Sequence, residues 1–149
     1  MMRRLIIILL SAYAFLSADA IISPFFGIPW RPFFTPLLTL LGFAFAALHA
    51  GQRFGWGRAG LLMGLTFVVS LAFESIGVAT GWIYGPYHYT VSLGPRFLGL
   101  VPFIIPLTWF MMMSPAYVIA ESVPTRHSTV RLWSWRLGVA AMGGIVMTA

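Results

Sequence analysis

Hydrophobic residues in this chain gather in runs long enough to cross a membrane, and short polar segments separate the runs. The runs cover about residues 5–22, 33–50, 61–83, 98–120 and 132–149. Since about 20 apolar residues in a helix cross the hydrocarbon core, the first four are predicted to be transmembrane helices. The apolar part of the fifth begins near Leu137 and gives about 13 residues, or ~20 Å of helix, against a core of roughly 30 Å. The pattern predicts an all-α, polytopic transmembrane helical bundle with four spans plus a partial or short fifth, forming a single domain over residues 1–149.

The first run also has the features of a secretory signal. Arg3 and Arg4 precede its apolar part, and small residues at Ala18 and Ala20 follow it. A chain this hydrophobic uses its first span for insertion, so we interpret residues 5–22 as a retained helix. A cleaved signal remains the alternative interpretation.

Composition and charge support the membrane class. Of the 149 residues, 60% are hydrophobic and 8% are charged, proportions that a soluble domain of this size does not need. The net charge of +6 arises from nine arginines at the ends of the apolar runs. This placement indicates contact with anionic lipid headgroups and argues against nucleic acid as a partner.

The distribution of arginine predicts the orientation in the cell (inner) membrane. With the N-terminus inside, seven arginines fall on inner segments and two on outer ones, which satisfies the positive-inside rule. The inner residues are Arg3, Arg4, Arg53, Arg58, Arg126, Arg131 and Arg136, and the outer ones are Arg31 and Arg96. The loop of residues 84–96 is therefore expected outside, with Glu74 in the outer half of its helix.

Several kinds of chemistry are not supported by the sequence. The absence of cysteine excludes disulfides and thiolate metal sites. In the predicted topology His49 and His127 lie toward the inside and His88 toward the outside, so they cannot share a metal ion. Phosphate-binding and dinucleotide-binding motifs are absent as well. We expect neither a metal nor a cofactor.

Glu74 is a single acid inside the third apolar run. A carboxyl at this depth is costly in lipid and by default marks a functional site that faces the bundle interior. On a helix it shares one face with Ser70, Gly77, Gly81 and Tyr84, and the two glycines would allow close approach of a helix or a flat ligand. The alternative is a packing notch in which the acid pairs with Arg96 or with a tyrosine.

An aromatic loop and a pair of prolines follow this helix. The segment GPYHY places Tyr87, His88 and Tyr89 just beyond the acid, and irregular backbone at this depth is tolerated only in a protein interior or around a cavity. Pro102 and Pro106 are expected to kink or unwind the start of the fourth span, one turn before Trp109.

The order of these residues carries a family resemblance. After Glu74, Gly77 and Gly81 come YGPYHYT (84–90), LGP (93–95) and GLVPFIIPLTW (99–109). This order, over about residues 70–120, resembles the carotenoid biosynthesis membrane protein family, of the bisanhydrobacterioruberin hydratase and gamma-carotene hydratase type. Family members are longer, and the resemblance concerns their N-terminal half. It implies cofactor-independent hydration of a terminal isoprenoid double bond of a carotenoid.

Such a hydration needs an acid, stabilisation of a tertiary carbocation and a held water. Glu74 is the expected acid, the ring faces of the aromatic residues would stabilise the cation, and His88 or a tyrosine hydroxyl would orient or deprotonate the water. The expected catalytic residues are Glu74, Tyr87, His88 and Tyr89. The expected substrate-binding residues are Ser70, Gly77, Gly81, Tyr84, Pro102, Pro106 and Trp109.

Three functions are compatible with these residues. The first is a carotenoid hydratase of the lyase type. The second is a non-catalytic carotenoid- or lipid-binding subunit of a larger membrane complex, for example a photosynthetic one, and the third is an orphan bundle such as a transporter fragment. Expected partners are a carotenoid or other long isoprenoid, membrane lipids, and a partner chain or a second copy. Because the fifth span is short, we expect this chain alone to show little or no hydratase activity.

Overall fold

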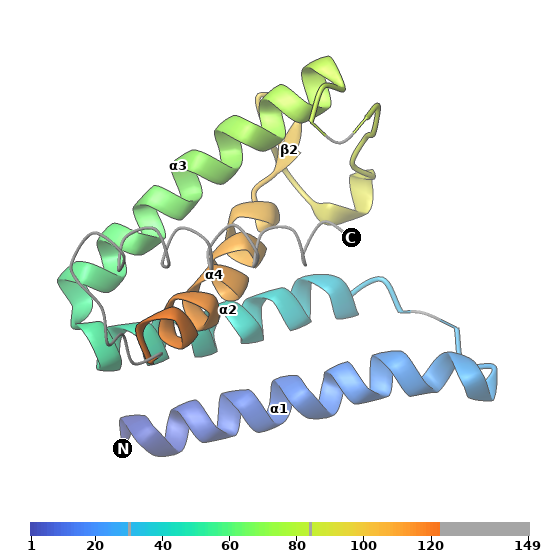
Figure 1. Ribbon diagram of the computed structural model, residues 1–149. Coiled ribbons are helices and arrows are strands. Elements are labelled where there is room, and N and C mark those ends of the chain that lie inside the picture. The colour runs from blue at the N-terminus through green and yellow to red at the C-terminus, as the bar shows by residue number, and fades with distance from the viewer. Residues whose placement is uncertain (30, 84, 123–149) are drawn as a thin grey trace. The chain divides into compact units, whose positions relative to one another are not determined.

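The computed structural model describes residues 1–29, 31–83 and 85–122, and this part of the chain is mostly helical. It contains the helices α1 (Met2–Ile22), α2 (Phe34–Phe54), α3 (Trp56–Thr80) and α4 (Ile104–Ser122), shown from blue to orange in Figure 1. Two short 3-10 helices, η1 (Ser23–Phe26) and η2 (Val91–Leu93), and two strands, β1 (Arg96–Phe97) and β2 (Val101–Pro102), complete the described elements. The predicted fifth span, His127 and the last three arginines lie outside the described residues.

Three of the described helical segments are long and apolar enough to cross a membrane. They are Met2–Phe26, Phe34–Phe54 and Trp56–Thr80, and a shorter apolar helix covers Ile104–Ile119. The chain is therefore an all-α membrane protein, as the hydropathy pattern predicts.

The fourth apolar run starts differently from the prediction. Residues 98–103 are not helical, because the chain first forms an antiparallel hairpin in which Arg96 is opposite Pro102 and Phe97 is opposite Val101. Pro102 lies in β2, ahead of the helix, and Pro106 lies in the first turn of α4. A proline in the first turn removes an N–H that has no helical partner there. Pro106 is therefore compatible with a helix that begins at Ile104, and Pro115 lies in the interior of α4.

Contacts divide the chain into two compact units, Met1–Met111 and Met112–Ala149, and the core described here belongs to the first. Within it α1 packs against α2, and α2 packs against α3. Ala46 and Ala50 of α2, Ala59 of α3 and Phe110 of α4 form a buried cluster. Alanine at the contact positions allows the helix backbones to approach closely, as is common between membrane helices.

Helix α3 has two faces of opposite character. Its buried residues are Ala59, Thr66, Ser70, Glu74 and Gly77, and its exposed large residues are Trp56, Leu61, Leu65, Val68, Val69, Phe73 and Ile76. The hydroxyls of Thr66 and Ser70 donate to carbonyls of their own helix, at 2.8 and 3.2 Å. A helix with small and polar residues inside and bulky apolar residues outside is suited to a lipid environment.

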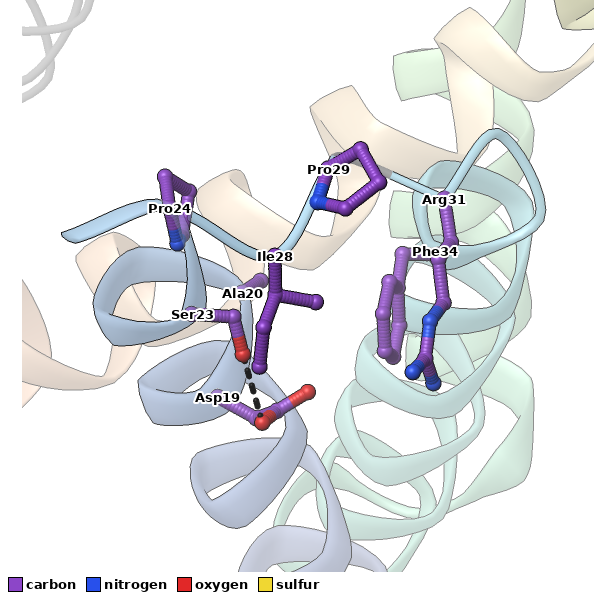
Figure 2. Close-up of a pocket in the computed structure, with 8 residues that line it drawn as sticks. All are labelled: Asp19, Ala20, Ser23, Pro24, Ile28, Pro29, Arg31 and Phe34. Atoms are coloured by element: carbon purple, nitrogen blue, oxygen red, sulfur yellow. Dashed lines mark hydrogen bonds between the residues drawn. The ribbon is translucent and has the colours of Figure 1, made fainter. Parts of the chain in front are cut away.

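A small pocket lies where α1 passes into the connector that leads to α2 (Figure 2). Ser23 donates a 2.8 Å hydrogen bond to Asp19, and the Arg31 guanidinium lies 5.9 Å from the centroid of the Phe34 ring, in cation–π range. Asp19 and Arg31 lie on opposite sides of the pocket. Both interactions are local, one at the end of α1 and one at the start of α2, and the pocket shares no residue with the group around Glu74.

Candidate functional site

The carboxyl group of Glu74 is the centre of the candidate site. Glu74 is 6% exposed, and each of its oxygens has hydrogen-bond donors from outside its own helix. Oε2 accepts from the hydroxyls of Tyr87 and Tyr89, both at 2.7 Å, and Oε1 accepts from the indole nitrogen of Trp109 at 3.0 Å. A buried acid is costly unless such partners satisfy it, so three aromatic residues here make its burial possible.

The end of α3 directs the chain back toward this carboxyl. The helix stops at Thr80 because Gly81 takes a left-handed conformation (φ +68°), and the Gly81 N–H donates to the carbonyl of Gly77 at 2.8 Å. Glycine adopts this conformation without the steric cost that other residues meet. Gly81 is therefore a helix cap, whereas the periodicity predicts a position on the helix face.

Tyr87 and Tyr89 reach the same oxygen because they are two residues apart in an irregular, non-helical segment. Residues i and i+2 of an extended chain point to the same side. Their rings meet edge to face, with centroids 5.6 Å apart and planes at 83°. This is a favoured aromatic geometry, and it places both hydroxyls over Glu74.

Trp109 approaches Glu74 from α4. The hairpin of β1 and β2 ends at Pro102, α4 begins two residues later, and the indole of Trp109 then lies in the second turn. An indole N–H is only a donor. The sequence predicts Trp109 as a binding or cation-stabilising ring, and the hydrogen bond to Oε1 is a role that its spacing does not reveal.

The hydroxyl of Tyr89 holds its proton more strongly than an ordinary tyrosine. Burial raises the pKa of Tyr89 well above its usual value of 10.0, and the hydrogen bond to Glu74 and the charge of that carboxyl add to the effect. Removal of this proton would leave two negative groups side by side in a partly buried position. Tyr89 therefore keeps its hydroxyl proton at all physiological pH values.

Arg96 has a different partner from the one that its charge suggests. Its guanidinium donates to the backbone carbonyl of Tyr89 at 2.6 Å, while Glu74 accepts from the tyrosines and the indole. Of the two pairings considered from sequence for a packing role, the tyrosine pairing is the one that the structure contains. No spacing rule in the sequence indicates the bond from Arg96 to the carbonyl.

The remaining predicted residues lie around this group or apart from it. Ser70 and Gly77 are buried on the Glu74 side of α3, and Pro102 and Pro106 are fully buried. His88 is exposed and lies outside the hydrogen-bonded group, and Tyr84 lies outside the described residues. Over the described ranges, no group of three His, Cys, Asp or Glu side chains could hold a metal ion.

The fold and this site define a helical membrane protein with a buried acid under an aromatic loop. The chain belongs to the carotenoid biosynthesis protein family, whose model matches residues 34–149. It is similar to bisanhydrobacterioruberin hydratase of Haloarcula japonica, with 44% identity over 80 residues, which are 52% of this chain and 27% of that protein. The chain thus spans about a quarter of the length of this curated relative. No solved structure matches the chain.

Proposed function

We propose that this protein hydrates a terminal isoprenoid double bond of a carotenoid by acid-initiated addition of water, with Glu74 as the acid. A role in carotenoid biosynthesis follows from the family, and the name of the similar hydratase supports the reaction class. The observation that carries the proposal is the unequal environment of the two oxygens of Glu74.

This environment identifies the oxygen that carries the transferable proton. Trp109 can only donate, so Oε1 is an acceptor in either protonation state of Glu74. In the acid form the proton therefore sits on Oε2. A tyrosine hydroxyl both donates and accepts, so one of the two hydroxyls turns to accept from Oε2 and no hydrogen bond is lost.

The reaction needs one proton and one water. Oε2 delivers its proton to the less substituted alkene carbon, a C–H bond forms, and the π electrons leave a tertiary carbocation. The oxygen of a water bonds to that cation, and the surplus proton returns to the carboxylate. The net change is addition of H₂O, so the atoms balance without an oxidant or a reductant. General acid catalysis by a positioned group contributes about 10²–10⁴-fold.

The aromatic residues supply the remaining requirements. The polar edges of Tyr87, Tyr89 and Trp109 meet the carboxyl, so their rings lie near the reacting bond, where a ring face would attract a cation through its quadrupole. A tyrosine hydroxyl beside Oε2 is suited to hold the water, and the exposed His88 is the second candidate for that role. The polyene would lie along the buried Ser70 and Gly77 side of α3.

The arrangement in the membrane is also part of the proposal. We place residues 1–149 in one transmembrane domain of the cell membrane with the N-terminus inside, so that the tyrosine loop lies near the outer surface. A partner chain or a second copy would complete the bundle. The distribution of arginine carries this arrangement, and labelling of the two loops tests it.

A non-catalytic carotenoid- or lipid-binding role is the second candidate, and one observation favours it. The hydrogen bonds that the Glu74 carboxyl accepts from Tyr87, Tyr89 and Trp109 all join α3 to the loop or to α4. Such a group can serve to hold the loop closed over a bound pigment without transferring a proton.

Expression of the complete protein in a lycopene-producing bacterium distinguishes the two candidates. A hydratase converts lycopene to a more polar pigment whose mass is greater by one water, which chromatography with mass spectrometry detects. Purified protein that carries unchanged lycopene, with no hydrated product even when a partner chain that completes the bundle is expressed with it, would support the binding role and overturn the hydratase proposal.

A further inference from the structure

The tyrosines over Glu74 come from a segment with little regular structure of its own. Between the end of α3 and the start of β1 the described backbone contains one regular element, the 3-10 turn Val91–Leu93. A hydroxyl placed by such a segment would lose its alignment unless the backbone next to it is held. The bond from Arg96 to the carbonyl of Tyr89, at 2.6 Å, holds it at the residue that contacts Glu74.

The strand that carries Arg96 is itself well fixed. The N–H of Phe103 donates to the carbonyl of Pro95 at 3.1 Å, and the N–H of Leu100 donates to that of Phe97 at 2.9 Å. Leu98 and Gly99 are the central residues of the turn that the Leu100 bond closes, and their φ of +50° and +72° are both positive, as in a type I′ turn. The whole connection between the paired residues Phe97 and Val101 has three residues, 98–100. Arg96 therefore extends from a hairpin of defined register and not from a loop.

The same hairpin leads directly into α4 and so toward Trp109. The hairpin is thus connected to the donors of both carboxyl oxygens. Arg96 of β1 fixes the backbone of Tyr89, whose hydroxyl reaches Oε2, and α4, which follows β2, brings the indole to Oε1. The described residues contain no carboxylate paired with Arg96. The bond from its guanidinium to the neutral Tyr89 carbonyl is charge-assisted, a stronger class than a bond between neutral groups.

We propose that Arg96 is a positioning residue, which holds the carbonyl of Tyr89 so that the Tyr89 hydroxyl stays on Oε2 of Glu74. The inference rests on the proposed function, and it concerns alignment of the acid and not contact with the substrate. The alternative is that Arg96, on the predicted outer side of the membrane, only contacts lipid headgroups. In that case its replacement would have no influence on Tyr89.

The first test follows Tyr89 itself and needs no turnover. The absorbance of tyrosinate is followed as the pH is raised, for the parent protein and for Tyr89→Phe in detergent. The difference between the two curves is the ionisation of Tyr89, whose neighbouring titratable or charged groups are Glu74, Tyr87 and Arg96. Loss of the Arg96 charge by itself would raise the pKa of Tyr89, so a move down toward the pKa of ordinary tyrosine in Arg96→Met, which we expect, reports loss of the contact with Glu74. Arg96→Lys, which keeps a charge and a donor, should restore part of the difference and also serves if the methionine variant does not fold. Arg31→Met is the matched control, because it removes the other predicted outer arginine, and it should leave Tyr89 unchanged.

The second test is a double-mutant cycle on hydration. Arg96→Met should lower the rate of product formation at saturating lycopene about as much as Tyr89→Phe, and adding it to Tyr89→Phe should cost little more, because both act through one hydroxyl. An unmoved Tyr89 titration in the folded lysine and methionine variants, or fully additive losses, would overturn the positioning role. A moved titration with no hydration by the parent protein, either alone or with the partner chain that completes the bundle, would refute the proposed function and leave the positioning role standing.

Discussion

Trp109 donates a 3.0 Å hydrogen bond to Oε1 of Glu74 across 35 residues of sequence. The bond gives the carboxyl two different ends, because the indole can only donate while the tyrosines at Oε2 can also accept. Replacement of each partner should therefore have a distinct effect.

Replacement of Glu74 by Gln should abolish hydration while the protein still accumulates in the membrane. Gln keeps the shape and one acceptor oxygen, but it has no acidic proton, so we expect a loss of roughly 10²-fold or more. Pigment chromatography measures the product, and immunoblotting of membranes measures the protein. Asp19→Asn, the same change at an acid bonded to Ser23, is the control and should keep activity. If the Gln variant instead fails to accumulate in the membrane, the result would contradict the role of Glu74 as the acid and would favour a packing role.

Replacement of Trp109 by Phe separates its hydrogen bond from its ring. If the N–H matters, the buried Oε1 loses its donor, and the free energy of unfolding should fall by about 1–3 kcal/mol with a loss of hydration. Thermal unfolding in detergent and pigment analysis provide the two measurements. Trp82→Phe is the control at an indole that is 88% exposed. If Trp109→Phe is as stable and as active as the parent protein, the hydrogen bond is not needed and only the ring of Trp109 contributes.

Tyr89 should make the folded protein sensitive to alkali. Its folded-state pKa lies above the unfolded value of 10.0, so the unfolded chain loses this proton first as the pH rises. The contribution of Tyr89 to the free energy of unfolding is thus fully present below pH about 10 and declines as the pH rises toward the folded-state pKa. Tyr89→Phe should remove most of that decline. Denaturant or thermal unfolding midpoints of the parent protein and of Tyr89→Phe, measured below and above this pH, test the prediction. An equally steep decline of stability with pH in Tyr89→Phe would contradict it.

Gly81 should tolerate substitution poorly for reasons of backbone conformation. Its φ is +68°, whereas a Cβ added at this position would lie 3.4 Å from the backbone nitrogen of Pro86, an ordinary van der Waals contact, so the expected cost comes from the backbone conformation. Gly81→Ala should cost about 1–2 kcal/mol, the usual penalty for the left-handed region, and Gly81→Asn should cost less. Gly64→Ala is the matched control within α3, where nothing lies within 4 Å of the added Cβ, and it should be neutral or stabilising. Equal effects at the two positions in thermal unfolding would refute the capping role.

The predicted topology places the α2–α3 connection and the tyrosine loop on opposite sides of the membrane. The chain has no cysteine, so single cysteines at Gln52 and Ser92, both exposed positions, can be labelled without background. A membrane-impermeant reagent applied to intact spheroplasts should label Ser92→Cys at once and Gln52→Cys only after lysis. Labelling of both positions in intact cells would exclude the arrangement derived from the arginines.

The sequence by itself determined the class of protein and the residues worth attention. Runs of apolar residues are a local property, and so they were enough to predict membrane helices, of which the described structure confirms the first three as long and apolar enough to span, while the fourth run holds a shorter apolar helix. Glu74 and the nearby tyrosines stood out because a polar group in such a run needs a partner. The ordered glycines, prolines and aromatic residues indicated the carotenoid biosynthesis family, which the family match confirms.

Only the tertiary structure decided which donor meets which oxygen. The partners of Glu74 are 13, 15 and 35 residues away, and their approach depends on where α3 ends, how the loop returns and where α4 begins. The periodicity continued α3 through Gly81 and began the fourth helix near residue 98, because hydropathy does not register a left-handed cap or a tight hairpin turn. The bond from Arg96 to the Tyr89 carbonyl has no sequence signal, since a backbone acceptor is the same at every residue.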